Sequence, residues 1–397
     1  MHRFIFYIII YTFILYGIVS FYNIILFNQN DAGGIVGYLA VLSLLIIEAM
    51  AIALIIKHMR SFLSSKISTS ILLWTLYAVL ISVMMTDSLF SDVRSLIWWP
   101  SVYSLFFLIA KIDYNETRIS LILNKVVPFV FIVYIVLFAM LRSMNMVNFT
   151  ASGSSIFISD NSIFYIVTLL PLLSFLPKKT KYILYCLAII ATVYSFKRSA
   201  SLYTALLFLI SLYFDFIYKK NVRASYILLL ILLLSVFFLG IDYLNTSTDG
   251  HLFERFQSLD EDGGSGRTDI WVDVLNRFWS KDFIYRILGS GFDGVINGGY
   301  FYSAHNDFIE MLYDFGYIGF ILYMMFVSLF IRLVHKSKKL GINYYQANVS
   351  AFVVFVVMSM VSHLWLYPSF FAYIMMVLGF TEGKMSRNRI ALIRKHK

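Results

Sequence analysis

Residues 263–320 read GGSGRTDIWVDVLNRFWSKDFIYRILGSGFDGVINGGYFYSAHNDFIEMLYDFGYIGF, and this stretch differs from almost everything around it. It contains glycines, tryptophans, acidic residues, arginines and a histidine, whereas the flanking chain consists mainly of apolar runs. Ionisable groups in an otherwise apolar chain are costly to keep and mark functional positions. We therefore expect the chemistry of the protein in this stretch, assisted by residues at the ends of neighbouring helices.

The composition of the whole chain indicates a membrane protein that crosses the bilayer many times. Of its 397 residues, 60% are hydrophobic and 14% are charged, and the mean hydropathy is +0.79, whereas soluble domains contain roughly 25% charged residues. The apolar runs predict an all-α integral membrane protein. We predict about twelve transmembrane helices, at residues 4–26, 35–56, 67–85, 95–111, 121–141, 160–176, 182–196, 199–217, 225–244, 317–334, 347–364 and 367–381.

The charges of the connecting segments predict how these spans are oriented. Seven basic segments hold 23 of the 32 Lys and Arg residues, and 17 of the 22 acidic residues lie on the opposite side. By the positive-inside rule, the basic segments and both termini are cytoplasmic. The net charge of +10 therefore orients the protein and contacts anionic lipid. Because no basic folded domain exists to carry it, binding of nucleic acid is excluded.

We interpret residues 1–397 as a single polytopic membrane domain with one large extramembrane segment. That segment, residues 245–303, connects spans nine and ten on the outer side, and we expect short helices within it. Residues at helical spacing predict a helix over 268–280, packed on the membrane domain by an apolar stripe of Trp271, Val274, Leu275 and Phe278. Residues 304–316 are expected to form an interfacial helix that leads into span ten.

Three basic residues on the outer side are candidates for an anion site. Lys197 and Arg198 form the short link between spans seven and eight, and Arg267 precedes the helix expected over 268–280. A guanidinium group presents a planar fork to a phosphate, which lysine does not. The alternatives are snorkelling of Lys197 and Arg198 to lipid headgroups and an ordinary ion pair between Arg267 and Asp269 or Asp273.

His305 is the candidate general base, because its pKa suits proton transfer near neutral pH. On a helix capped by Ser303, His305 lies on the apolar face that packs on the bundle. The acids on the opposite face, expected to face solvent, are Asp307, Glu310 and Asp314. The alternatives are a purely structural histidine or, if the helix turns the other way, one of the carboxylates of Asp269, Asp307 and Glu310 as the base.

Other polar residues have weaker claims to a role. His363, at the outer end of span eleven, is a reserve candidate, and Asn306 is a possible supporting residue. Glu48 is alone inside span two, where an acid is a functional hypothesis by default. The acidic residues 260–262 match no EF-hand spacing, and Cys186 is the one cysteine of the chain. We therefore predict neither a metal site nor a cofactor.

Several short motifs follow one another in a recognisable order: Ser195–Ser199 (SFKRS), Gly266-Arg267 with Trp271, Gly289–Phe292 (GSGF), Ala304–Asn306 (AHN) with Glu310, and Gly316 with Gly319. In this order they resemble the O-antigen polymerase and O-antigen ligase superfamily of bacterial inner membranes. The motif region covers about a sixth of the chain, and the arrangement of the spans is similar over the rest.

The resemblance implies a GT-C-like helical bundle with a large periplasmic loop. Members of the superfamily move a glycan from undecaprenyl diphosphate to an acceptor hydroxyl at the periplasmic face, without a nucleotide sugar or a metal ion. By resemblance, Arg198 and Arg267 bind the diphosphate, with Lys197 beside them, and His305 serves in catalysis. The implied partners are the lipid-linked oligosaccharide, membrane lipids and a separate chain-length regulator.

The residue types agree with this chemistry. Departure of the lipid diphosphate builds negative charge that fixed guanidinium groups stabilise, and one attack from the opposite face inverts the anomeric centre. Strong use of Ile, Phe, Tyr and Lys suggests an AT-rich gene, as is common for variable surface polysaccharides, and favours a polymerase. The alternatives are a ligase that transfers the glycan to lipid A core and, in another class, a flippase, although no related halves are visible.

Overall fold

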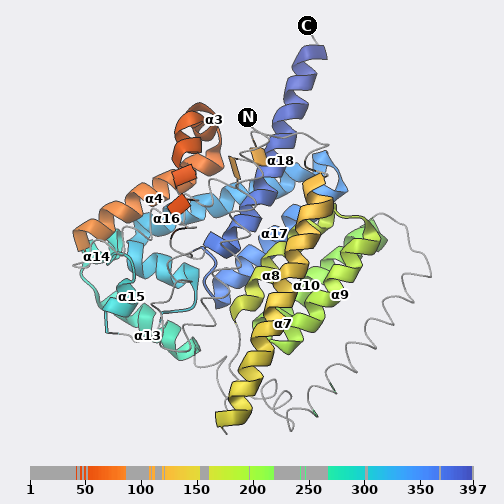
Figure 1. Ribbon diagram of the computed structural model, residues 1–397. Helices are drawn as coiled ribbons and strands as arrows, with labels where there is room; N and C mark the ends of the chain where they lie inside the picture. The colour runs from red at the N-terminus through yellow and green to blue at the C-terminus, as the bar shows by residue number, and fades with distance from the viewer. Residues whose placement is uncertain are drawn as a thin grey trace. The chain divides into compact units, whose positions relative to one another are not determined.

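The computed structural model describes residues 42, 45–46, 49–50, 52–85, 107–108, 110–111, 119, 121–152, 161–195, 197–218, 242, 246, 267–299, 303–365 and 368–395. All regular elements within these ranges are helical (Figure 1), which is consistent with the predicted all-α membrane protein. The predicted span 4–26, almost all of 225–244, much of 35–56 and 95–111, Glu48 and the acidic residues 260–262 lie outside the described residues.

Five of the described helices are long and apolar enough to cross a membrane. They run over Lys66–Met85, Leu123–Met140, Arg198–Phe216, Asp307–Leu340 and Ile342–Val361, and each overlaps a predicted span. A shorter apolar segment covers Phe164–Phe175. The total of twelve spans and the GT-C-like arrangement stay predictions.

The chain divides into two compact units that interleave along the sequence. The first comprises residues 1–47, 114–258 and 340–354, and the second comprises 48–113, 259–339 and 355–397. In the first unit, α9 (Lys178–Tyr194) packs on α7 (Val127–Ser152) and α10 (Arg198–Leu212). A buried ion pair between Lys181 and Asp215 ties the start of α9 to η4 (Tyr213–Tyr218), the π-helical continuation of α10.

The second unit is built around α16 (Asp307–Ser337). This helix packs against α4 (Lys66–Met85), α13 (Arg267–Ser280), α14 (Phe283–Leu288), α15 (Gly294–Asn297) and α18 (Pro368–Lys395) (Figure 1). The core of the unit is aromatic: the Trp74 ring lies 5.3 Å from the rings of both Phe315 and Trp365, measured between centroids. Burial of such large rings stabilises the unit, because each removes roughly 150–250 Å² from solvent.

The helix predicted over 268–280 is present as α13, and its apolar stripe is the reason that it packs where it does. Val274 and Phe278 are buried in a cluster with Val295, Ala304 and Tyr313. The indole N–H of Trp271 donates to the carbonyl oxygen of Ala304 at 2.8 Å. The helix therefore fixes the segment that carries His305.

Two glycines allow α14 and α16 to approach each other. Gly289 ends α14 with φ 96° and ψ −177°, and Gly316 interrupts α16 with φ 61° and ψ −167°; both values belong to a region that essentially only glycine adopts. A Cβ atom on Gly289 would lie 2.2 Å from the carbonyl oxygen of Asp314, and one on Gly316 would lie 2.4 Å from that of Ile287. The loop after α14 is therefore held against the first turns of α16.

Candidate active site

The sequence motif around His305 lies immediately before α16, and not within a helix as predicted. Asn306, and not Ser303 as predicted, is the N-cap: its side-chain Oδ1 accepts from the backbone N–H of Phe308 at 3.0 Å and of Ile309 at 3.2 Å. His305 precedes the cap with φ 50°, in the left-handed region. A non-glycine residue there is uncommon, and such residues are found at functional sites.

The prediction that the acids of α16 face solvent is wrong. Asp307, Glu310 and Asp314 are 0%, 5% and 2% exposed. Two of these carboxylates accept hydrogen bonds from backbone N–H groups. Glu310 accepts from Ala304 at 2.7 Å, and Asp314 accepts from Val295 at 3.1 Å. Buried polar groups in proteins are usually hydrogen-bonded in this way. The acids therefore lie on the face of the helix that packs against the protein.

Asp307 is held by the segment that joins α17 (Ile342–Val361) to α18. One carboxylate oxygen accepts from the backbone N–H groups of Leu364 at 3.0 Å and Trp365 at 2.9 Å, and from the hydroxyl group of Ser359 at 2.8 Å. The other oxygen lies 3.4 Å from Nδ1 of His363. Asp307 therefore fixes the position of this histidine.

His363, the reserve candidate of the sequence, occupies the centre of the cluster. Its Nε2 lies 2.9 Å from Oγ of Ser303, and its Nδ1 lies 3.4 Å from carboxylate oxygens of both Asp307 and Glu310. Separations of 3.4 Å are weak as hydrogen bonds but strong as charge contacts in a buried place. The ring of His305 packs against that of His363, with 5.3 Å between the centroids.

The charges around His363 raise its pKa. Burial alone lowers the pKa, because it disfavours the imidazolium form, and the Arg267 guanidinium acts in the same direction. The carboxylates of Glu310 and Asp307 more than offset these effects, so that the pKa of His363 lies above its ordinary value. The cluster therefore holds a proton more tightly than a free histidine does.

This raised pKa predicts how stability depends on pH. The folded state binds the proton of His363 more tightly than the unfolded state, so its contribution is fully present below about pH 6.5 and is lost as the pH rises through the folded pKa. We expect the apparent melting temperature in detergent to fall over that range, and to fall less in His363→Gln. The control is His335→Gln, at an exposed position near the end of α16. Identical profiles for wild type and His363→Gln would contradict the assignment.

Arg267 contacts the segment that contains His363. It opens α13, and its Nη1 donates to the carbonyl oxygen of Val361, two residues before His363. Asp273 pairs with Arg277 at 3.3 Å, and Asp269 is exposed on α13. Arg267 and His305 are therefore brought together at residues 361–363, although 38 positions separate them in the sequence.

Lys197 and Arg198 belong to the other unit, so their convergence with Arg267 stays a prediction. Arg198 begins α10, and the preceding Lys197 lies with its ammonium group 5.7 Å from the centroid of the Phe164 ring. The hydroxyl group of Ser195 accepts from the backbone N–H of Lys197 at 3.1 Å and donates to the carbonyl oxygen of Thr192 at 2.6 Å. Ser195 thus links the end of α9 to the backbone of Lys197.

Sequence reasoning missed Ser303 and Ser359 as partners in the cluster. The closeness of Ser303 to His305 in the sequence could have indicated its role. Ser359 is 52 residues from its partner Asp307, and no sequence pattern connects the two. In the described part of the chain, no three His, Cys, Asp or Glu side chains are arranged so that they could hold a metal ion.

Comparisons with known proteins concern one segment of the chain. A search of curated proteins finds no match. Residues 183–324 match the family model described as O-antigen ligase, and the matched segment contains Arg198, Arg267 and His305. This segment of the chain is therefore similar to O-antigen ligases.

Proposed function

We propose that the protein is a polysaccharide polymerase of the bacterial inner membrane. It transfers a glycan from undecaprenyl diphosphate to the acceptor hydroxyl of another lipid-linked repeat unit at the periplasmic face, without a metal ion, and both termini are cytoplasmic. The observation that carries this proposal is the meeting of Arg267 and His305 at residues 361–363. The proposed partners are the lipid-linked oligosaccharide, membrane lipids and a chain-length regulator.

Arg267 has the role of stabilising the leaving group. As the bond between the anomeric carbon and the diphosphate oxygen breaks, its electron pair passes to the diphosphate. A guanidinium already held in place by the Val361 carbonyl group stabilises that charge without having to reorganise. In this proposal Arg198 and Lys197 supply further positive charge to the same diphosphate.

His305 has the role of the general base. The acceptor oxygen forms the new bond to the anomeric carbon and gives its proton to the imidazole ring, so a single displacement inverts the centre. His305 is only half-buried, whereas Asp307 and Glu310 are buried and engaged with backbone N–H groups. The carboxylates of Asp307 and Glu310 lie next to His363, whose ring packs on that of His305. Their negative charge stabilises the positive charge that this pair of imidazole rings gains when the proton is transferred.

The choice between polymerase and ligase is tested with purified protein in nanodiscs. Undecaprenyl-diphosphate repeat units are supplied without and with lipid A core, and the products are separated on a gel. A ladder on the lipid carrier in the absence of lipid A core is the expected result. Product only after addition of lipid A core would make the protein a ligase, and no product with intact substrate would direct the next test to flipping of the lipid.

Loss of the Arg267 side chain is expected to reduce transfer about 10²–10³-fold, as removal of one preorganised charge-stabilising donor does. We expect Arg267→Ala to accumulate in the membrane at the wild-type level, because the residue is half-buried at the start of α13. The matched control is Arg332→Ala, which removes an exposed arginine of α16. Transfer by Arg267→Ala at the rate of the control would remove the residue from the mechanism.

A further inference from the structure

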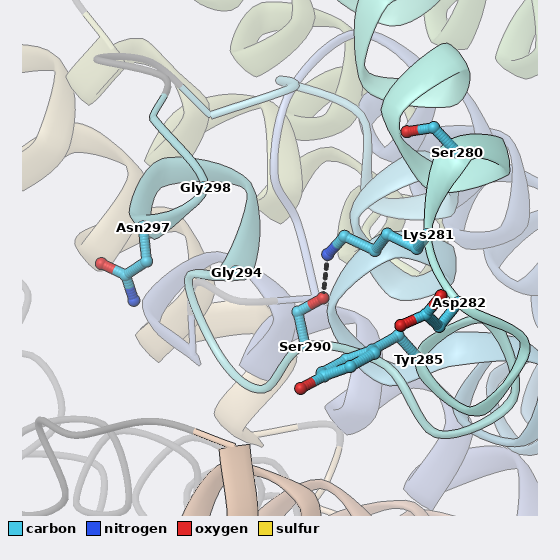
Figure 2. A pocket seen from close by; sticks show the side chains of 8 residues that line it. All are labelled: Ser280, Lys281, Asp282, Tyr285, Ser290, Gly294, Asn297 and Gly298. Carbon is cyan, nitrogen blue, oxygen red and sulfur yellow. Dashed lines mark hydrogen bonds between the residues drawn. The ribbon is translucent and has the colours of Figure 1, made fainter.

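A pocket of about 450 Å³ opens where α13, α14 and α15 meet, and none of its lining residues belongs to the His305 cluster. Its volume falls in the range of roughly 300–1,000 Å³ that small-molecule sites occupy. The lining residues, drawn in Figure 2, are Ser280, Lys281, Asp282, Tyr285, Ser290, Gly294, Asn297 and Gly298. The proposed mechanism uses none of them.

Lys281 is the fixed cation of this pocket. Its ammonium group donates to Oγ of Ser290 across the pocket (Figure 2) and lies 3.7 Å from the centroid of the Tyr313 ring. Burial lowers its pKa to about 8, and the nearby Asp314 opposes this shift. An ammonium group has three N–H donors, so Lys281 keeps donor capacity for a ligand in an orientation that Ser290 and Tyr313 already set.

The remaining lining supplies acceptors, donors and an aromatic face. Asp282 and Tyr285 come from the beginning of α14, and Asn297 comes from the end of α15 on the opposite wall (Figure 2). Tyr285 is 43% exposed, so its ring is open to contact. The carboxylate of Asp282 offsets the charge of Lys281, which disfavours a diphosphate here. A polyhydroxyl ligand fits the lining, because each hydroxyl group both donates and accepts and the sugar ring offers an apolar face to Tyr285.

The pocket lies within reach of a glycan whose reacting end is at the His305 cluster. Asp314, which binds the backbone N–H of Val295 behind the pocket, lies seven residues after Asp307 on α16. At a rise of 1.5 Å per residue, the two positions are about 10 Å apart along the helix. A short oligosaccharide spans such a distance.

We propose that this pocket binds sugar residues of the glycan at a distance from the bond that is transferred. The inference rests on the proposed function for the identity of the glycan. It assigns Tyr285 and Asn297 to recognition of the repeat unit, with Lys281 as an oriented donor. Repeat-unit selectivity then comes from α14 and α15, while the reacting groups are on α13 and at the start of α16.

The test measures binding directly, with the full chain in nanodiscs. The probe is the repeat-unit oligosaccharide released by mild acid from the undecaprenyl diphosphate lipids of the same host. We expect the double variant Tyr285→Ala, Asn297→Ala to weaken binding at least 10-fold, and Lys281→Gln to weaken it as well. Ile284→Ala is the matched control, because this exposed residue of α14 does not line the pocket; it is expected to bind as wild type does.

The binding and transfer assays separate this inference from the proposed function. The double variant is expected to raise KM for the repeat unit and to leave kcat near the wild-type value, since the pocket does not contact the reacting bond. Binding that depends on Tyr285 and Asn297 in a protein that shows no transfer would support the pocket and reject the proposed function. Equal binding by wild type and the double variant, or no binding by wild type, would overturn the inference.

Discussion

Replacement of His305 by alanine is expected to lower glycan transfer by about 10²–10⁴-fold, the contribution of a positioned general base. The residue is half-buried, precedes the N-cap of α16 and packs on the ring of His363. Because its side chain fills no part of the aromatic core, we expect His305→Ala to fold and to accumulate as wild type does. Initial rates of polymer formation in nanodiscs measure the effect.

Two comparison variants make this result specific. His335→Ala removes an exposed histidine near the end of the same helix and is expected to keep full activity. His363→Gln is expected to slow transfer and to shift the pH profile of kcat, because His363 and its carboxylate partners set the electrostatic surroundings of His305. Transfer by His305→Ala within 10-fold of wild type would reject the base assignment, and Asp269, an exposed carboxylate on α13, would be tested next.

Substitution of Gly316 by alanine is expected to destabilise the protein by about 2–6 kcal/mol. Backbone in a glycine-only region costs on the order of 1–3 kcal/mol for another residue, and overpacking adds about 1–3 kcal/mol. The new Cβ would lie 2.4 Å from the carbonyl oxygen of Ile287 and 2.6 Å from the backbone nitrogen of Gly289. Both neighbours are backbone atoms, so no rotation of a side chain relieves the clash. This cost is a large share of a typical stability of 5–15 kcal/mol.

Gly341→Ala is the matched control for this prediction. Gly341 also has a positive φ, of 114°, but a Cβ added there meets nothing within 4 Å. This variant therefore carries the backbone strain alone, and we expect it to melt between wild type and Gly316→Ala. Apparent melting temperatures are read from size-exclusion profiles after heating in detergent. Equal melting of the two variants would show that close packing of α14 on α16 contributes nothing.

The sequence was most informative where one pattern had one structural solution. The apolar stripe of α13 predicted its helix and its buried face, and Val274 and Phe278 are buried as expected. The unusual polarity of residues 263–320 likewise pointed to Arg267 and His305, which the structure brings to one segment. These features follow from local periodicity and composition, which the sequence contains directly.

The sequence did not reveal which face of the first turns of α16 is buried. Helical spacing placed Asp307 and Glu310 on one face but could not tell whether that face meets solvent or protein. The N–H groups that make burial tolerable come from Ala304, Leu364 and Trp365, the last two more than 50 residues away. His363 was only a reserve candidate in the sequence, because its partners Asp307 and Glu310 are also more than 50 residues away.

The Lys281 pocket also depends on features that sequence patterns do not display. The loop that carries Ser290 lies between two glycines with positive φ, Gly289 and Gly291. Their backbone conformation turns Ser290 toward Lys281, nine residues away. The sequence displays the glycines of this region, but the direction of its side chains follows from the approach of α14 to α16.

The interleaving of the two units also sets the order of events during biosynthesis. Asp307 leaves the ribosome before its partners Ser359, Leu364 and Trp365, which follow 52 to 58 residues later. At about 5–20 residues per second, this delay lasts about 3–12 s. During that interval the carboxylate has none of these donors, and α17 must insert before the imidazole pair can assemble. If the proposed mechanism holds, we expect a nascent chain arrested before this point to be inactive, because the imidazole pair is not yet assembled.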